Sequence, residues 1–139
     1  TAPVGLRVGS TQHYGINDPD SDIEWSRLIP SGGHLVHVRN ETGELKKYTV
    51  TLLHQFKCLD VIRRQYNGPP TTPLSSLTIH CMNYLRQSVL CHLNIGLESV
   101  MNVMGTVAGT YDLVCNDWTQ LYEEVERNQK AFRKQHPSM

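Results

Sequence analysis

The chain has 139 residues, 39% of them hydrophobic, and its 13 basic residues balance its 13 acidic ones. That length suits one domain with a buried core, so we expect a single domain over residues 1–139. The charge balance argues against binding to nucleic acid, which needs clustered Lys and Arg. No apolar run approaches the roughly 18–20 residues that a membrane span needs.

The N-terminal part of the chain predicts an arm followed by a β-hairpin. Residues 1 to about 30 are rich in Gly, Pro, Asn and Asp, which favours an irregular arm with one short helical turn near residues 22–29. Residues 34–39 alternate between polar and apolar side chains, as a strand does, and residues 45–48 can return as its partner. The turn between them falls at residues 40–43.

Three helices are expected in the rest of the chain. Apolar residues recur at helical spacing over residues 49–66, and a second helix should run from Pro73 to about His92, with Thr72 as its N-cap. Residues 100–107 suit either strand or loop, and residues 117–134 predict an amphipathic third helix. The fold class expected is therefore mainly α with a small β-hairpin (α+β).

The cysteines and one sequon indicate a secretory compartment. An even count of four cysteines in a short chain suits two disulfides, although it would also suit a metal site. Asn40 opens an Asn-Glu-Thr sequon, which predicts glycosylation at that residue. We expect the lumen of the secretory pathway. Because the sequence opens on Thr1 without a signal peptide, we also expect a trimmed or processed form.

The spacing of the cysteines limits how they can pair. Cys81 and Cys91 are ten residues apart on one predicted helix, which separates them by about 15 Å. A disulfide needs Cα atoms within about 7 Å, so these two cannot pair. We favour Cys58–Cys81 with Cys91–Cys115. The pairing of Cys58 with Cys91 and of Cys81 with Cys115 stays open.

Two polar stripes are the strongest functional signal in the sequence. His54, Lys57, Cys58 and Val61 share one face of the first long helix. The corresponding stripe of the second helix is unusually polar for a core face, and its members are Leu77, His80, Cys81, Tyr84, Ser88 and Cys91. Two such stripes on neighbouring helices predict a pocket between them.

These segments resemble a known family. Residues 54–64 and 80–91 are similar to the UstYa-like fungal proteins, which tailor secondary metabolites and carry two His-x-x-His-Cys motifs. The resemblance extends to residues 22–28, 33–38 and 115–118. It implies an N-terminal membrane anchor in the full-length protein, and histidines that bind a metal, copper, for oxidative chemistry.

This sequence departs from the family pattern at positions that would bind the metal. Lys57 stands where the first motif has its second histidine, and Leu77 stands where the second motif has its first. Leu113, Asn94 and Gly96 depart from the pattern as well. If a metal bound, only His54 and His80 would remain in the motifs to hold it, and neither Lys nor Leu replaces an imidazole as a ligand. We therefore expect no metal and no other cofactor, with copper as the alternative.

Three functions follow, in order of preference. The first is a metal-independent cyclase or pericyclase that binds a small-molecule or peptide intermediate between the two helices. Its expected catalytic residues are His54, Lys57, His80 and Tyr84, and its expected substrate-binding residues are Leu77, Ser88 and Val61. The second is a copper-dependent oxidase that recruits His34, His37, His92 or a partner chain. The third is a non-catalytic subunit that pairs with a relative; a homodimer is also possible.

Overall fold

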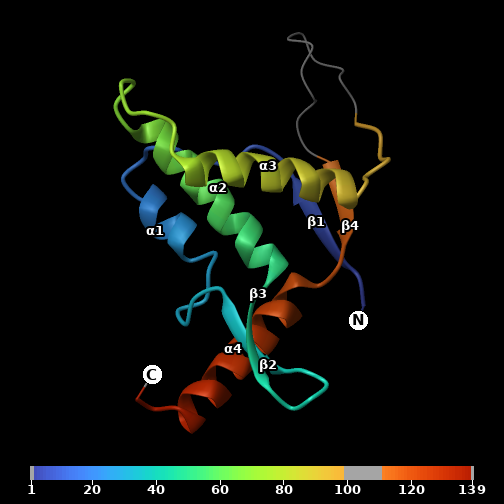
Figure 1. The fold of residues 1–139 in the computed structure, drawn as a ribbon. Coiled ribbons are helices and arrows are strands. Elements are labelled where there is room, and N and C mark those ends of the chain that lie inside the picture. The colour runs from blue at the N-terminus through green and yellow to red at the C-terminus, as the bar shows by residue number, and fades with distance from the viewer. Residues whose placement is uncertain (1, 99–110, 139) are drawn as a thin grey trace.

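The computed structural model describes residues 2–98 and 111–138, and its helices and strands confirm the α+β class (Figure 1). In chain order the elements are β1 (Val4–Val8), α1 (Ser21–Ser26), β2 (Leu35–Arg39), β3 (Leu45–Thr49), α2 (Thr51–Asn67), α3 (Ser76–Cys91), β4 (Tyr111–Cys115) and α4 (Trp118–Gln135). The strands form two separate antiparallel pairs, β1 with β4 and β2 with β3. The sequence suggestion for residues 100–107 lies outside the described residues.

The predicted hairpin is confirmed, and its turn is organised by one side chain. Asn40 Oδ1 accepts hydrogen bonds from the backbone N–H groups of Thr42 and Glu44, at 3.1 and 2.8 Å, and from the Thr42 hydroxyl at 2.8 Å. Asn is favoured in such turns because its side chain replaces a backbone acceptor. Gly43 has a φ of +82°, a conformation that glycine adopts without a steric penalty.

The arm expected over residues 1–30 contains its predicted short helix, α1, but the expectation of irregular structure elsewhere is wrong where the strand β1 forms. β1 pairs with β4 from Val4 opposite Cys115 to Val8 opposite Tyr111. The partner strand lies more than 100 residues away in the sequence, so no local pattern predicts this pairing. The pair joins the N-terminal strand to the segment that precedes α4, beside the C-terminal end of α3, whereas the C-terminus itself lies at the far end of α4 (Figure 1).

The two central helices match their predicted positions except at one end. α2 begins at Thr51, two residues after the expected start at residue 49, which belongs to β3, and α3 begins at Ser76 and not at Pro73. Ser75, not Thr72, is the N-cap, because its hydroxyl accepts from the Thr78 N–H at 3.0 Å. Gln65 of α2 supplies Oε1 to the Ser75 N–H at 3.1 Å and to the Thr78 hydroxyl at 3.0 Å. A side chain of one helix thus fixes the start of the next.

The C-terminal helix α4 packs on the hairpin through amide side chains. Asn128 accepts from the His37 N–H and donates to its carbonyl, at 2.9 and 2.7 Å. Gln129 is buried and donates to the carbonyls of Gly33 and Leu35 at 2.8 and 3.1 Å. These bonds satisfy backbone groups that strand pairing leaves open.

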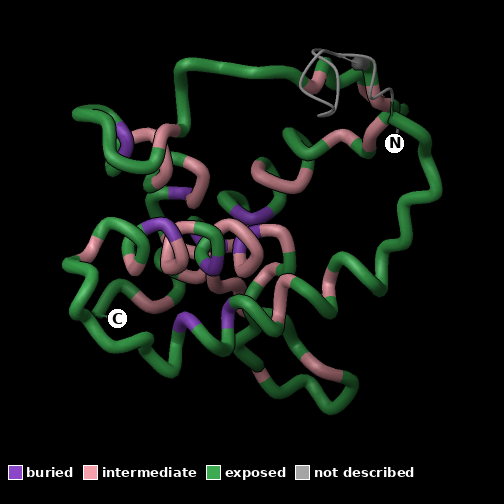
Figure 2. Tube along the Cα trace, turned by 90° about the horizontal axis from the view of Figure 1, so that it is seen from above, coloured by how far each residue is buried: buried purple, intermediate pink, exposed green. Residues whose placement is uncertain are grey.

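Among the described residues, the fully buried core is small and lies among the helices (Figure 2). Its hydrophobic members are Leu53, Cys58, Cys81 and Val125. Several residues of the predicted apolar stripe of α2 are more open, and Leu59 and Tyr66 are 40% and 75% exposed. In a domain with so little apolar burial, hydrogen-bonded polar groups and covalent links contribute a larger share of the stability.

Arg63 of α2 is the main buried charge, with a side chain only 4% exposed. Its guanidinium donates to Asp60 at 2.8 Å, to Asp22 at 2.7 Å and to the Ile16 carbonyl at 3.0 Å. The hydrogen bond from Arg63 lowers the pKa of Asp22. This Arg63 cluster fastens the N-terminal arm to α2, as a fully partnered buried cation can.

Within the described ranges, no helix combines the length and the apolar character needed to cross a bilayer.

Candidate functional site

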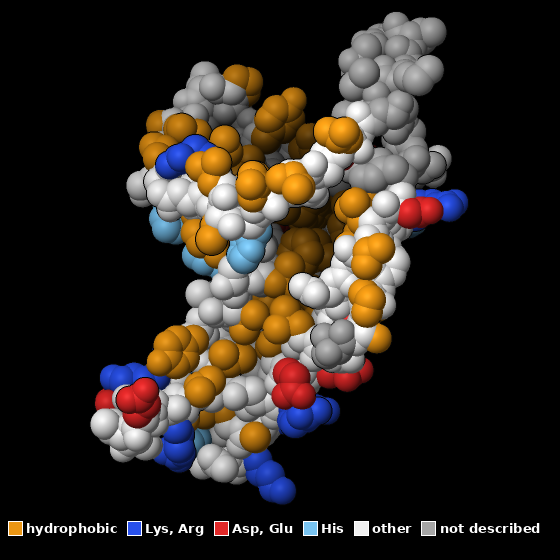
Figure 3. All heavy atoms as spheres, turned by 90° about the vertical axis from the view of Figure 1, so that its right-hand side faces the viewer, with side chains coloured by type: hydrophobic (Ala, Val, Ile, Leu, Met, Phe, Trp, Pro, Cys, Tyr) orange, Lys and Arg blue, Asp and Glu red, His pale blue; other side chains and the backbone are white. Residues whose placement is uncertain are grey.

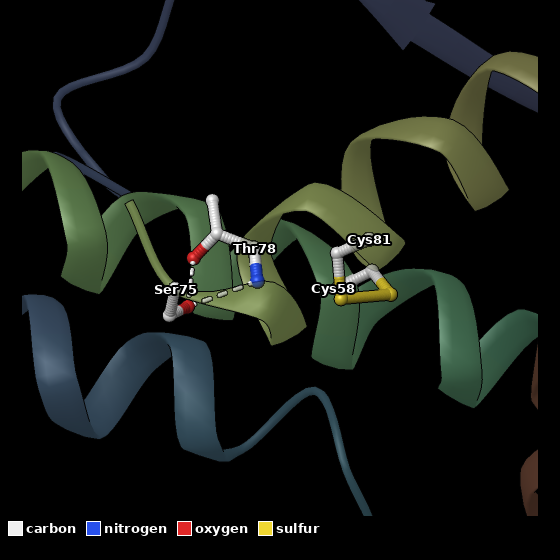
Figure 4. The surroundings of a disulfide bond; sticks show 4 residues. All are labelled: Cys58, Ser75, Thr78 and Cys81. Atoms are coloured by element: carbon white, nitrogen blue, oxygen red, sulfur yellow. Dashed lines mark hydrogen bonds between the residues drawn. A yellow bond between two sulfur atoms is a disulfide. The ribbon is translucent and has the colours of Figure 1, made fainter. Parts of the chain in front are cut away.

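A disulfide joins the two helices that carry the polar stripes. Cys58 and Cys81 are bonded, with Cα atoms 4.8 Å apart, and both are almost fully buried (Figure 4). This confirms the favoured pairing and excludes Cys58–Cys91. The Ser75–Thr78 hydrogen bonds lie close by on α3. The crossing of α2 and α3 is therefore held covalently at its centre.

The second favoured disulfide is wrong in this structure, because Cys91 and Cys115 are both free thiols. Cys91 is exposed at the last residue of α3. Cys115 is half-buried and lies in the β1–β4 ladder opposite Val4. The long-range strand pairing, which the sequence did not reveal, thus determines where Cys115 lies.

The disulfide brings together three of the four residues expected to be catalytic. His54 lies one turn before Cys58, while His80 and Tyr84 flank Cys81. The rings of His54 and Tyr84 stack, with centres 3.9 Å apart and planes 25° apart. The ring of His80 is centred 6.0 Å from His54 and 6.2 Å from Tyr84. We call these three residues the His–Tyr cluster.

The polar atoms of the His–Tyr cluster are available to a ligand. No described residue forms a hydrogen bond with the ring nitrogens of His54 or His80, or with the Tyr84 hydroxyl. His54 and Tyr84 are half-buried and His80 is exposed. The stack fixes the plane of the His54 ring and leaves its nitrogens at the ring edge. The face drawn in Figure 3 is hollowed, with hydrophobic side chains around the hollow and histidines to one side.

Burial, followed by the neighbouring His80, lowers the pKa of His54. Both causes disfavour the imidazolium form. His54 is therefore neutral around pH 7 and can accept a proton or a hydrogen bond.

His34, which the sequence offered only as a replacement ligand in the oxidase alternative, is a neighbour of His54. Burial is the main cause that lowers the pKa of His34, followed by electrostatic interaction with Lys57 and then with His54. Its Nδ1 lies 2.9 Å from the Thr49 hydroxyl, and its carbonyl accepts from the Val50 N–H just before α2. The sequence did contain a signal for the position of His34. A hairpin made of residues 34–39 and 45–48 sets residue 34 opposite the start of the helix that follows.

The other expected site residues do not join the His–Tyr cluster. Lys57 is exposed and lines a cavity of about 370 Å³ that includes Trp25 of α1. Val61 lines that cavity and another of about 340 Å³ at the loop ends of α2 and α3. Leu77 is 55% exposed, and Ser88 is half-buried one turn beyond Tyr84.

One large apolar cavity lies away from the two polar stripes. A cavity of about 620 Å³ is lined on α2 by Leu52 and Phe56. These residues are each two positions from His54, a rotation of about 200° around the helix. This cavity and the His–Tyr cluster lie on opposite faces of α2.

The donor set of the described residues does not fit a tight copper site. No three His, Cys, Asp or Glu side chains among them are grouped so as to hold a metal ion. Cys58 and Cys81 are consumed by their disulfide, which leaves His54 and His80 as a pair. Two imidazoles supply fewer ligands than protein metal sites ordinarily provide.

Comparison with known proteins identifies the family. The family model described as "Mycotoxin biosynthesis protein UstYa" matches residues 13–128. The UstYa family oxidase phomYb of Diaporthe leptostromiformis is 27% identical over 134 residues, which cover 84% of this chain and 53% of the relative. The oxidase ustYa of Aspergillus flavus is 23% identical over 145 residues, which cover 90% of this chain and 68% of the relative.

The chain thus spans about half the length of the first of these relatives. No solved structure matches it. The family match includes both polar stripes and the Cys58–Cys81 disulfide. The chain belongs to the UstYa family of mycotoxin biosynthesis proteins.

Proposed function

We propose that this protein tailors a fungal natural product by closing a ring, and that the His–Tyr cluster moves protons during the closure. The observation that supports this is the stack of His54 on Tyr84 beside His80, with no described partner for any of the three polar groups. His80 is exposed and can bond to water, whereas His54 and Tyr84 are half-buried, where polar groups ordinarily have a hydrogen-bond partner. Unpartnered groups on a covalently fixed pair of helices are suited to a substrate.

The proposed reaction needs one acceptor and one donor. Neutral His54 accepts the proton of the substrate group that attacks, and the Tyr84 hydroxyl or the His80 ring N–H donates a proton to the group that is attacked. One proton leaves the substrate and one returns, so the ring closes without change of mass. The disulfide holds the donor and acceptor at fixed positions, which favours a near-attack geometry.

Oxidative tailoring is the second candidate, because both relatives are named oxidases. It would need a metal, and the motifs retain only His54 and His80 for one. Of the histidines considered as replacements, His34 is the one that interacts electrostatically with His54. His37 stacks instead on Phe132 of α4, and His92 is the C-cap of α3.

We also propose that the protein works in the secretory pathway on a small-molecule or peptide intermediate. The Cys58–Cys81 disulfide supports an oxidising compartment. The Asn40 sequon lies at the exposed end of the hairpin, where a glycosyltransferase can reach it.

The mass of the product distinguishes the two reactions. We would express the full-length protein in a fungal host together with the neighbouring biosynthetic genes and analyse the metabolites by mass spectrometry. The proposal expects a cyclised product with the mass of its precursor, formed by wild type and by His136→Ala but not by His54→Ala/His80→Ala. Loss of two hydrogens or gain of oxygen, with stoichiometric copper in the purified protein, would establish the oxidase instead.

A further inference from the structure

The cavity of about 620 Å³ has the size and the lining of a ligand site. It lies where β1, the end of α1, the start of α2 and the start of α4 meet. Its apolar walls include Leu6, Leu52, Phe56, Trp118 and Tyr122. Ligand sites are commonly concave spaces of about 300–1,000 Å³ with mainly apolar and aromatic walls and a few polar groups.

The walls on α4 are fixed before any ligand binds. The Tyr122 hydroxyl donates to the Leu28 carbonyl at 2.6 Å, and burial raises the pKa of that hydroxyl. Asp117 caps the helix through the Thr119 N–H at 3.0 Å, which sets the position of the neighbouring Trp118. Trp118 nevertheless remains 38% exposed, so part of its indole is open to a ligand.

Two charges of opposite sign line the same cavity. Arg27 comes from the C-cap of α1 and Glu123 from the second turn of α4, and both are exposed. Neither forms an ion pair with a residue in the described parts of the chain. On the same helix, Glu124 is already bonded to Arg127 at 2.7 Å. Arg27 and Glu123 are thus open to a ligand that carries the complementary charges.

We propose that this cavity binds a small zwitterion with an apolar body, of the type of a hydrophobic dipeptide with free termini. Its carboxylate faces Arg27, its ammonium group faces Glu123, and its apolar side chains contact Trp118 and Phe56. The site is distinct from the His–Tyr cluster, since Phe56 and His54 project from opposite faces of α2. The proposal does not depend on which reaction the cluster catalyses.

Tryptophan fluorescence can report this binding. The chain has two tryptophans, and Trp25 lies outside the cavity, with its Nε1 donating to the Gly15 carbonyl at 3.1 Å. In a Trp25→Phe background, Trp118 is the sole source of the signal. Leucyl-phenylalanine would be titrated beside its N-acetylated and C-amidated forms, with calorimetry on the wild-type protein as an independent measurement.

We expect saturable binding of the free dipeptide and about three- to fivefold weaker binding when either terminus is blocked, as is usual for charge pairs open to solvent. Glu123→Gln should remove the preference for the free amine, and Arg27→Gln the preference for the free carboxylate. The matched controls Glu126→Gln and Lys130→Gln change exposed charges of α4 outside the cavity lining and should keep both preferences.

Equal binding of free and blocked dipeptides, or no saturable binding by either method, would overturn the proposal. So would preferences that survive in Arg27→Gln and Glu123→Gln variants shown to be folded by circular dichroism. His54→Ala should leave dipeptide binding unchanged, and a loss there would show that the two sites are not separate. The ring-closure proposal stands or falls on product mass and is not affected by these titrations.

Discussion

The Arg63 cluster and the His–Tyr cluster are both polar groups on α2, yet they differ in how they are partnered. Arg63 is buried and its three hydrogen bonds go to Asp60, Asp22 and the Ile16 carbonyl. The three side chains of the His–Tyr cluster stack on or lie beside one another, without a hydrogen bond from any described residue to their polar atoms. Hydrogen bonds to the protein therefore distinguish a polar side chain that stabilises the fold from one that is available for binding or chemistry.

The largest expected effect is the loss of catalytic rate in His54→Phe, which tests whether the His–Tyr cluster is functional. Phenylalanine keeps the stack on Tyr84 but removes both ring nitrogens, so catalysis should fall by about 10²–10⁴-fold, the range for a lost general base. Because those nitrogens have no described partner, the midpoint of thermal unfolding should stay the same or rise. Product formation and unfolding would be measured on the same preparation, with His92→Phe as the control. Full activity in His54→Phe would make the His–Tyr cluster structural.

Arg63→Ala should do the opposite and reduce stability first. Breaking a buried ion pair costs about 3–5 kcal/mol, and this change also releases the N-terminal arm. Arg64→Ala is a matched control, because Arg64 bonds to the same Asp60 carboxylate but has a side chain 54% exposed. It should cost less than about 1 kcal/mol in urea unfolding. Equal losses in the two variants would contradict the structural role of Arg63.

Removing the disulfide tests what fixes the His–Tyr cluster. Cys58 and Cys81 are 23 residues apart, and a link over that separation stabilises by about 3 kcal/mol in the chain-entropy description. Cys58→Ala/Cys81→Ala should lose about that much, whereas Cys91→Ala should lose little. Thiol titration of the unfolded, unreduced wild type should find the two thiols of Cys91 and Cys115. If the titration found no free thiol, Cys91 and Cys115 would be disulfide-bonded to each other after all.

The smallest expected effect is on the pH dependence of stability. The pKa of His54 and that of His34 are both lowered on folding, so the unfolded chain binds more protons below its ordinary histidine pKa of about 6.5. Stability should therefore rise as the pH increases from about 5 to about 7.5. The groups facing these rings are His80, Tyr84 and Lys57. In melting curves across this range, His54→Phe and His34→Gln should flatten the slope, and an unchanged slope would argue against both shifts.

Local patterns in the sequence predict much of this fold. Apolar spacing locates α2 and α4, alternation locates the hairpin, and the helical rise excludes one cysteine pairing. The polar stripes also place His54, His80 and Tyr84 together, because both stripes pass through the bonded cysteines. Each of these predictions depends on residues that are close in sequence or share one helix face.

What the sequence missed depends on distant contacts. The β1–β4 pairing joins the N-terminal strand to a segment more than 100 residues away, and Cys115 in that segment is not bonded to Cys91. From the sequence alone, Arg63 is typical of a solvated helix residue. In the structure it bonds to Asp22 and to the Ile16 carbonyl, which are both more than 40 residues away in the sequence. The observed start of α3 differs from the predicted start because the Ser75 N–H bonds to Gln65 of α2. A capping rule based on neighbouring residues does not include that contact.

The turn at Asn40 has a consequence for the surface of the protein. Its Oδ1 accepts three hydrogen bonds inside the turn, whereas its Nδ2 donates, among the described residues, to Glu44 alone, at 3.5 Å. A sugar joined to Nδ2 would leave the bonds that shape the turn intact. The hairpin extends beside α4, at the end of the molecule away from α3 (Figure 1). A glycan there would shield the hairpin tip from proteases and from other chains while leaving the helices of the His–Tyr cluster uncovered.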